Sequence, residues 1–158
     1  MEKEKLYEGV PLYGMVYGKL FALTNLIQTL GDEFFQEITI KQHFILIAVQ
    51  LFKEKPPTLK EVAEVAGCSY QNIKKIAILL EKKGYLIIQH DTSDKRKCRL
   101  ILTGKIHKIS AKLDVGITDF FDTLFKNLSE RQIKNILAGL LQMERNIEAF
   151  KEEKNEKN

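Results

Sequence analysis

The strongest constraint on the fold is a pair of helical stretches, 58–66 and 69–83, separated by a tight break and followed by two β-prone runs. Thr58 and Glu61 have the spacing of a capping box, which opens a helix at the first stretch. Hydrophobic residues recur at helical intervals in the second stretch, so this helix is expected to bury one face. The residues of that face are Ile73, Ile76, Ala77 and Leu80. Two helices joined so closely predict a helix-turn-helix.

The break between the two stretches meets the physical demands of that motif. Ala63 supplies the small residue needed where the helices touch, and Gly67 tolerates the positive φ of a tight turn. Ser69 is a suitable N-cap for the second helix. The pattern is moderately specific, because similar helix pairs also occur in proteins that never touch DNA.

After Gly84 the hydrophobic period changes from that of a helix to that of a strand. The runs 85–88 and 99–102 are short, apolar and β-prone, and a polar, charged loop lies between them. This pattern predicts a β-hairpin with an extended tip, in which Asp94 pairs with Arg96 and holds its guanidinium in one pose. The charged residues of the tip are Asp94, Lys95, Arg96 and Lys97.

Longer helical patterns flank this region on both sides. The predicted helices cover residues 11–30, 39–52, 106–125 and 129–150. Gly31 is expected to end the first helix, and Ser129 with Gln132 is expected to cap the last. Residues 1–10 are predicted to form a loose arm, and the polar tail 151–158 is predicted to fray.

The composition excludes several classes of protein. The chain has 158 residues, of which 44% are hydrophobic, and this is enough to form a hydrophobic core that needs no disulfide bonds for stability. Its longest apolar run, 44–49, is too short to span a bilayer, and its charged start predicts no signal peptide. The two cysteines exclude a disulfide framework and a four-cysteine zinc site. We expect a soluble cytoplasmic protein with no membrane partner.

The positive charge is concentrated in the middle of the chain. Residues 71–108 contain ten Lys or Arg and three acids, a net +7, whereas the whole chain carries +4 and the remainder therefore −3. A basic middle between mildly acidic ends is expected of a surface that binds a polyanion. A solvated lysine-rich face explains the charge alone equally well.

The outward face of stretch 69–83 follows from a rotation of about 100° per residue. The N-terminal residues of such a helix enter the major groove, so the predicted base-reading residues are Ser69, Tyr70, Gln71 and Asn72. Residues that can reach bases or phosphates are Lys74 and Lys75. The predicted contacts of the hairpin tip with phosphates and the minor groove are Lys95, Arg96 and Lys97. Ordinary surface polarity is the alternative for each. Ile78 is expected to be either an exposed apolar residue or a contact to thymine methyl groups.

Three segments together resemble the MarR family of winged-helix transcription regulators: ITIKQHFIL (38–46), TLKEVAEVAGCSYQNIKKIAILLEKKGYL (58–86) and HDTSDKRKCRLILTGK (90–105). The matching positions are Ile38, Thr39 and Gln42 at a helix start, Leu80, Glu81 and Gly84 at the exit of the recognition helix, and Asp94, Arg96, Leu102 and Thr103 in the wing. The resemblance covers about residues 12–150. Ser93 stands where family wings often carry another arginine, and the glycine usual a few residues past Leu-Thr is displaced to Gly104.

The resemblance implies a mainly α fold with a two- or three-stranded β wing, that is, a winged helix-turn-helix with N- and C-terminal dimerisation helices. The expected parts are an arm and dimerisation helix over 1–35, a DNA-binding lobe over 36–103, dimerisation helices over 104–150 and a disordered tail over 151–158. It also implies a homodimer that binds double-stranded DNA at an inverted repeat, as a transcriptional regulator and repressor. The apolar flanks independently favour a dimer, although part of them forms intrachain core. The candidate interface residues are Leu12, Val16, Leu124, Leu137, Leu140, Leu141, Ile147 and Phe150.

Members of the family often release DNA when a small aromatic or phenolic ligand binds. The residues that we expect to line such a pocket are Tyr13, Tyr17, His43, Phe44 and Phe120. Aromatic stripes more often belong to a core, which is the alternative here.

The sequence predicts no metal site, no cofactor and no catalytic set, so we expect no enzyme. His43, His90 and His107 lack the spacing of metal ligands. A thiol near a helix N-terminus can sense oxidants, but we interpret Cys68, and equally Cys98, as a small partly hydrophobic residue. The main alternative function is a winged-helix module that binds an acidic protein partner through its basic face.

Overall fold

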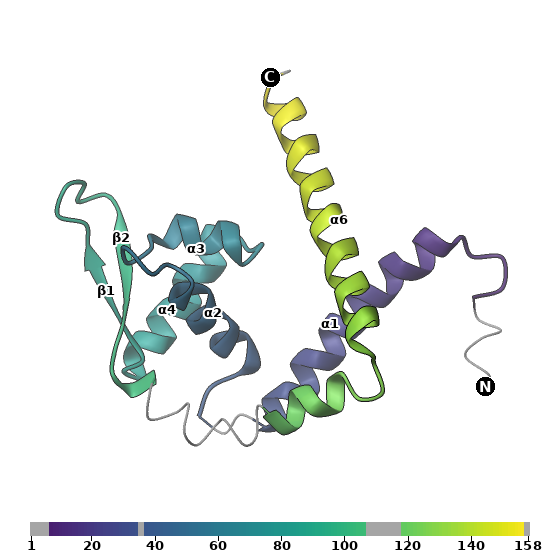
Figure 1. Cartoon of the computed structure of the whole chain (residues 1–158). Coiled ribbons are helices and arrows are strands. Elements are labelled where there is room, and N and C mark those ends of the chain that lie inside the picture. Colours follow the sequence, from purple (N-terminus) through teal and green to yellow (C-terminus); the bar gives the residue numbers. More distant parts are fainter. Residues whose placement is uncertain (1–6, 35–36, 107–117, 157–158) are drawn as a thin grey trace. The chain divides into compact units, whose positions relative to one another are not determined.

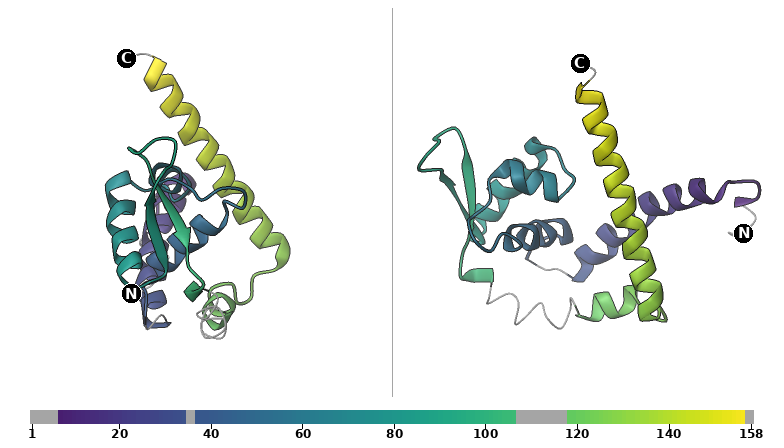
Figure 2. Two further views of the ribbon diagram at one scale, coloured as in Figure 1. Left: turned by 90° about the vertical axis from the view of Figure 1, so that its left-hand side faces the viewer. Right: turned by 45° about the horizontal axis from the view of Figure 1, so that its top comes forward.

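The computed structural model describes residues 7–34, 37–106 and 118–156. The chain divides into two compact units, residues 1–118 and 119–158. The first unit contains helices and a two-stranded sheet, and the described part of the second is helical. Figure 1 shows the elements of each unit, and Figure 2 shows the same ribbon from two other sides. The fold is mainly α with a small β wing, as the sequence predicts.

Helix α1 covers Leu12–Phe34 and runs beyond Gly31, so the prediction that Gly31 ends this helix is wrong. The reason is packing against the next helix. A Cβ atom at Gly31 would lie 2.3 Å from Cδ1 of Ile40, so only a glycine allows Ile40 to pack there. The glycine is therefore a close-contact position inside α1.

The centre of the first unit consists of α2 (Ile40–Gln50), α3 (Leu59–Val65) and α4 (Tyr70–Lys82). The predicted capping boxes are present at Thr39 and Thr58. In each, the threonine hydroxyl accepts a hydrogen bond from the backbone N–H three residues later, and the side chain of that later residue accepts one from the threonine N–H. These boxes fix where α2 and α3 begin, because they satisfy N–H groups that have no partner within the helix. The sequence therefore predicted both helices to within two residues of their observed ends.

One hydrophobic core joins these three helices to the sheet. Its fully buried side chains include Ile45, Leu46, Val62, Ile73, Leu80, Tyr85, Leu86 and Leu100. The predicted inward face of α4 is confirmed, because Ile73, Ile76, Ala77 and Leu80 are all buried. The helix-turn-helix is thus held by the apolar periodicity that is visible in the sequence.

The wing is an antiparallel hairpin of β1 (Leu86–His90) and β2 (Cys98–Leu102). Its register pairs Leu86 with Leu102 and His90 with Cys98. Both strands extend further toward the tip than the apolar runs indicate. β1 continues through the polar residues Gln89 and His90, and β2 begins one residue earlier, at Cys98, which pairs with His90. The segment before α3 also reaches β2, through an isolated bridge between Thr58 and Arg99.

In the second unit, α6 covers Glu130–Glu156 and is capped at Ser129 as predicted. The backbone N–H of Ser129 donates to Oε1 of Gln132 at 2.9 Å, and the N–H of Gln132 donates to Oγ of Ser129 at 3.3 Å. The prediction that the tail frays from residue 151 is wrong up to Glu156, because the helix continues through this lysine- and glutamate-rich segment, whose residues favour helix. The predicted helix over 106–125 lies largely outside the described residues; helix is present at 118–124.

Candidate nucleic-acid interface

The outward face of α4 carries the residues that were predicted to read bases. Ser69, Tyr70 and Gln71 are exposed, and Asn72 is half-buried. Ser69 also serves as the N-cap of α4, because its Oγ accepts a hydrogen bond from the N–H of Asn72 at 3.3 Å. Lys74 and Lys75 are exposed on the next turn, together with Ile78. The predicted orientation of the helix is therefore confirmed, and its polar N-terminal turn is accessible.

The turn before α4 fixes the direction in which this face points. Gly67 has a φ of +61°, the left-handed conformation that glycine adopts without strain. The N–H of Cys68 then donates to the carbonyl of Ala63 at 3.0 Å, which closes the turn on α3. Ala63 is buried, as expected for a small residue between two helices.

The C-terminal end of α4 forms hydrogen bonds with residues at the start of α2, Glu37 and Gln42, which we call the base of the lobe. Nζ of Lys83 donates to the carbonyl of Glu37 at 2.6 Å and to Oε1 of Gln42 at 3.2 Å. The Tyr85 hydroxyl donates to the Glu37 carboxylate at 2.5 Å, and Nζ of Lys105 lies 4.3 Å from the centre of the Tyr85 ring. Burial and the bond to Glu37 raise the pKa of Tyr85, so this hydroxyl stays protonated and donates at every ordinary pH.

These contacts change the interpretation of the basic middle of the chain. Lys83 and Lys105 lie at the base of the lobe and bond to it, and Arg99 is largely buried at the root of the wing. Three of the ten basic residues therefore hold the lobe together. Lys83 is nevertheless exposed, as are the cations of α4 and of the wing tip.

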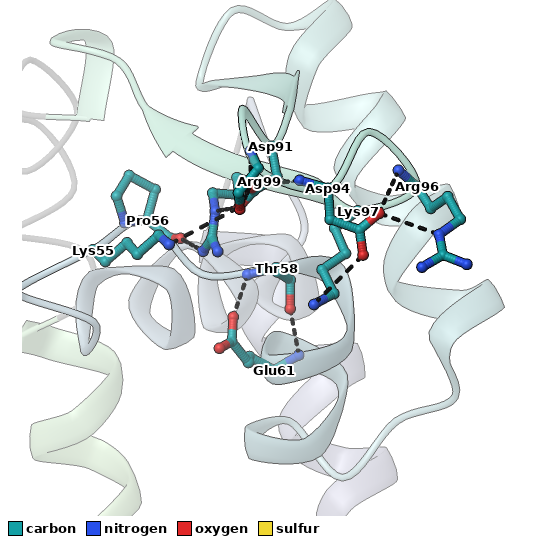
Figure 3. A network of polar contacts seen from close by, with 10 residues as sticks. Lys55, Pro56, Thr58, Glu61, Asp91, Asp94, Arg96, Lys97 and Arg99 are labelled. Carbon is teal, nitrogen blue, oxygen red and sulfur yellow. Dashed lines mark hydrogen bonds and ion pairs between the residues drawn. The ribbon is translucent and has the colours of Figure 1, made fainter.

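The wing tip presents cations from a turn of fixed shape (Figure 3). The Asp94 carboxylate accepts from the backbone N–H of Arg96 at 3.1 Å and from its Nε at 3.2 Å, which confirms the predicted pair. Nζ of Lys97 lies 3.7 Å from the same carboxylate. Hydrogen bonds from Arg96, backbone first, lower the pKa of Asp94. The Arg96 side chain is nevertheless 92% exposed, so its charge is held in place and faces solvent.

The comparisons with known proteins agree with this geometry. No family model and no curated protein matches the sequence. A MarR transcriptional regulator from Methanosarcina mazei Go1 is 20% identical, with 86% of this chain and 98% of that chain covered and a TM-score of 0.72. The S. aureus MepR–DNA complex is 21% identical (80% and 95% covered, TM-score 0.69). The Streptomyces coelicolor PcaV regulator, solved with its natural ligand, is 20% identical (87% and 92% covered, TM-score 0.66).

The fold is that of the MarR-family regulators. Within the MarR fold, the elements that resemble the family in sequence are the ones described above: the capped start of α2, the exit of α4 and the Asp-x-Arg wing. The described sheet is two-stranded, and an isolated bridge joins Thr58 to Arg99 of β2.

The sequence did not predict one polar contact at the root of the wing. Asp91 and Arg99 form a largely buried ion pair at the root of the wing. In the sequence analysis both residues contributed only to the net charge of residues 71–108. Hydrogen bonds from Ser93 and the Arg99 side chain lower the pKa of Asp91 well below its usual range. The available signal was the spacing of Asp91 and Ser93, which is typical of a turn in which the carboxylate accepts from the backbone two residues on.

The five residues of the predicted ligand pocket lie in both units. Tyr13 and Tyr17 are exposed on α1, at 78% and 66%, whereas Phe44 is half-exposed on α2. Burial lowers the pKa of His43, which therefore favours the neutral form. Phe120, which belongs to the second unit, is buried. One hollow in the first unit, of about 520 Å³, is lined by other residues: Leu51, Phe52, Lys53, Glu54, Lys55, Glu61 and Arg99.

The two cysteines, Cys68 and Cys98, are half-buried and pack against the core, in agreement with their interpretation as small hydrophobic residues. Over residues 7–34, 37–106 and 118–156, no group of three or more His, Cys, Asp or Glu is placed to hold a metal ion. His107 lies outside the described residues. No helix in the described part of the chain is long and apolar enough to cross a membrane.

Proposed function

We propose that this chain is a MarR-family transcription regulator that binds double-stranded DNA in a sequence-specific manner. The observation that carries the proposal is the combination, on one lobe, of an exposed polar N-terminal turn on α4 and a wing whose cations are held by Asp94. The MepR structure, a DNA complex, has the same fold. No catalytic residues are part of the proposal.

The two elements have different tasks on the duplex. Ser69, Tyr70, Gln71 and Asn72 read base edges in the major groove, where side-chain amides pair with adenine. Lys74 and Lys75 contact bases or phosphates. The wing cations, Lys95, Arg96 and Lys97, contact phosphates and the minor groove, and supply affinity without regard to sequence.

The functional unit is a homodimer. Helix α1 leaves a row of large apolar side chains exposed, among them Leu12, Val16, Phe21, Leu26 and Leu30. Helix α6 does the same with Ile136, Leu137, Leu140, Leu141, Ile147 and Phe150. Apolar surface on this scale is rare on a monomer and is typical of an obligate interface. A two-fold dimer places two recognition helices on the two halves of an inverted repeat.

A small aromatic effector releases the repressor from DNA. PcaV was solved with its natural ligand, and the aromatic and imidazole side chains for such a ligand here are Tyr13, Tyr17, His43, Phe44 and Phe120. The test is thermal unfolding of the purified protein with a panel of aromatic acids and phenols. A rise in melting temperature that Tyr17→Ala abolishes supports the effector site, and the absence of any shift across the panel contradicts it.

Selection of binding sites from random duplex DNA at near-physiological salt tests the main proposal. Enrichment of an inverted repeat with half-site centres about 10 base pairs, one helical turn, or a multiple of it apart is the expected result. A folded dimer that enriches nothing and has no affinity for any duplex contradicts the proposal and favours the module that binds an acidic protein.

A further inference from the structure

Asp91 lies where the chain leaves β1 for the wing tip, and it is 4% exposed. Its Oδ1 accepts three hydrogen bonds: from the Ser93 N–H at 2.7 Å, from the Ser93 hydroxyl at 2.5 Å and from the Asp94 N–H at 3.2 Å. One carboxylate oxygen therefore fixes the backbone at the start of the tip.

The second oxygen of Asp91 faces away from the tip, toward the connection between α2 and α3 (Figure 3). It pairs with Nε of Arg99, whose side chain is only 17% exposed. The same guanidinium donates from NH1 to the Pro56 carbonyl at 2.5 Å, and Nζ of Lys55 lies 4.0 Å from Oδ2. Asp91 and Arg99 thus tie the wing to a segment that is more than thirty residues earlier in the sequence.

The tied segment leads directly into the helix-turn-helix. Thr58 bridges to Arg99 in the sheet, and the Leu100 N–H donates to the Pro57 carbonyl at 2.8 Å. Thr58 is also the N-cap of α3, where Glu61 completes the capping box. The start of α3 and the root of the wing are therefore held by one contiguous set of polar contacts.

The same set continues outward to the cations of the tip. The Asp94 N–H bonds to Asp91, and the Asp94 carboxylate in turn holds Arg96 through its backbone N–H and Nε. A continuous series of hydrogen bonds therefore leads from Asp91 through Asp94 to Arg96.

We infer that Asp91, Arg99 and the Pro56 carbonyl form a wing latch, which holds the cations of the wing tip at a fixed place relative to the recognition helix. The inference rests on the proposed binding of DNA. Asp91 and Arg99 are positioning residues: neither is required to touch DNA. A fixed wing binds more tightly than a loose one, because less conformational freedom is lost when both elements engage the duplex together.

Asp91→Asn tests the latch, because the latch and simple electrostatics predict changes in DNA affinity of opposite sign. The substitution removes a negative charge close to DNA, so charge alone predicts tighter binding. It also removes the ion pair with Arg99, so the latch predicts weaker binding. If each protomer loses one phosphate contact, the expected weakening is about 30-fold at about 0.15 M salt, with a decrease of about 1.8 in the slope of log K against log salt.

Arg99→Lys is the second variant, and Glu64→Gln is the matched control. Lysine keeps the charge but cannot bond Asp91 and the Pro56 carbonyl with one planar group, so weaker binding is again expected. Glu64 is an exposed acid on α3 that pairs with Lys60, so its substitution changes the charge of the lobe without touching the latch. Circular dichroism establishes that each variant keeps its helix content, and Arg99→Lys preserves the test if Asp91→Asn does not fold.

Coupling to the wing tip separates positioning from a general loss of stability. In an Arg96→Ala background, Asp91→Asn is expected to cost much less affinity than in the wild type, because the cation that it positions is already absent. Binding by Asp91→Asn and Arg99→Lys that equals or exceeds that of the wild type, with an unchanged salt slope, overturns the latch and leaves the proposed function intact. A wild-type protein with no salt-dependent affinity for duplex DNA overturns both.

Discussion

Substitution of Arg96 by alanine tests the role of the wing as a phosphate contact. The side chain is 92% exposed, and its Nε bonds to Asp94 at 3.2 Å. Because it is not part of the core, we expect unchanged helix content and a melting temperature within about 2 °C of the wild type, since exposed ion pairs contribute about 0–1 kcal/mol.

The expected effect on DNA binding follows from counterion release. Each neutralised phosphate contributes about −0.9 to the slope of log K against log salt, and about a fivefold gain in affinity at about 0.15 M salt. A two-fold dimer loses two such contacts, so the slope decreases by about 1.8 and affinity falls about 30-fold. The loss is expected to be equal on the selected operator and on random duplex DNA.

Fluorescence anisotropy with labelled duplexes at four or five salt concentrations measures both quantities. Lys134→Ala is the matched control, because it removes an exposed cation on α6 that pairs with Glu130. An unchanged salt slope for Arg96→Ala would refute a phosphate contact. A loss confined to the operator would show that Arg96 reads bases.

Three further outcomes are expected. Gln71→Ala relaxes sequence preference at one base pair of each half-site and leaves the salt slope unchanged, as read from repeated site selection; equal losses on all sequences contradict a base-reading role. Thr58→Ala removes the cap of α3 and lowers the free energy of unfolding by about 1 kcal/mol in urea denaturation, whereas no change means that the box is not formed in solution. Because burial lowers the pKa of His43 below 6.5, the unfolded chain binds the proton first, so stability falls as the pH drops below that value. His43→Asn reduces this fall as the pH drops below about 6.5, and identical pH profiles would contradict burial of the imidazole.

The local elements of this protein were predictable because their determinants lie within a few residues of one another. The capping boxes at Thr39 and Thr58, the apolar face of α4 and the glycine turn at residue 67 are confirmed. So is the Asp94–Arg96 pair, whose members are two residues apart. Each of these features depends on short-range backbone geometry, which the spacing of residue types records directly.

Failures of prediction occur where a distant residue decides the outcome. A glycine at position 31 is typical of a helix end, but in the structure it lies inside α1, where the absence of a side chain leaves room for Ile40. Lys83 and Lys105 counted toward a basic surface, although both bond to the base of the lobe. No local pattern distinguishes a glycine that stops a helix from one that permits contact.

The sequence by itself determined the helix-turn-helix, the hairpin and the charged wing tip, since helix caps, turns and apolar periodicity are local properties. Only the tertiary structure decided which charges are free to meet a partner and which are used internally. Asp91 and Arg99 are eight residues apart along a hairpin, and the carbonyl that completes their network belongs to Pro56. Pairing of strands brings these groups together, and burial then makes each charge depend on the other, because a lone charge in the same place loses its water without gaining a partner.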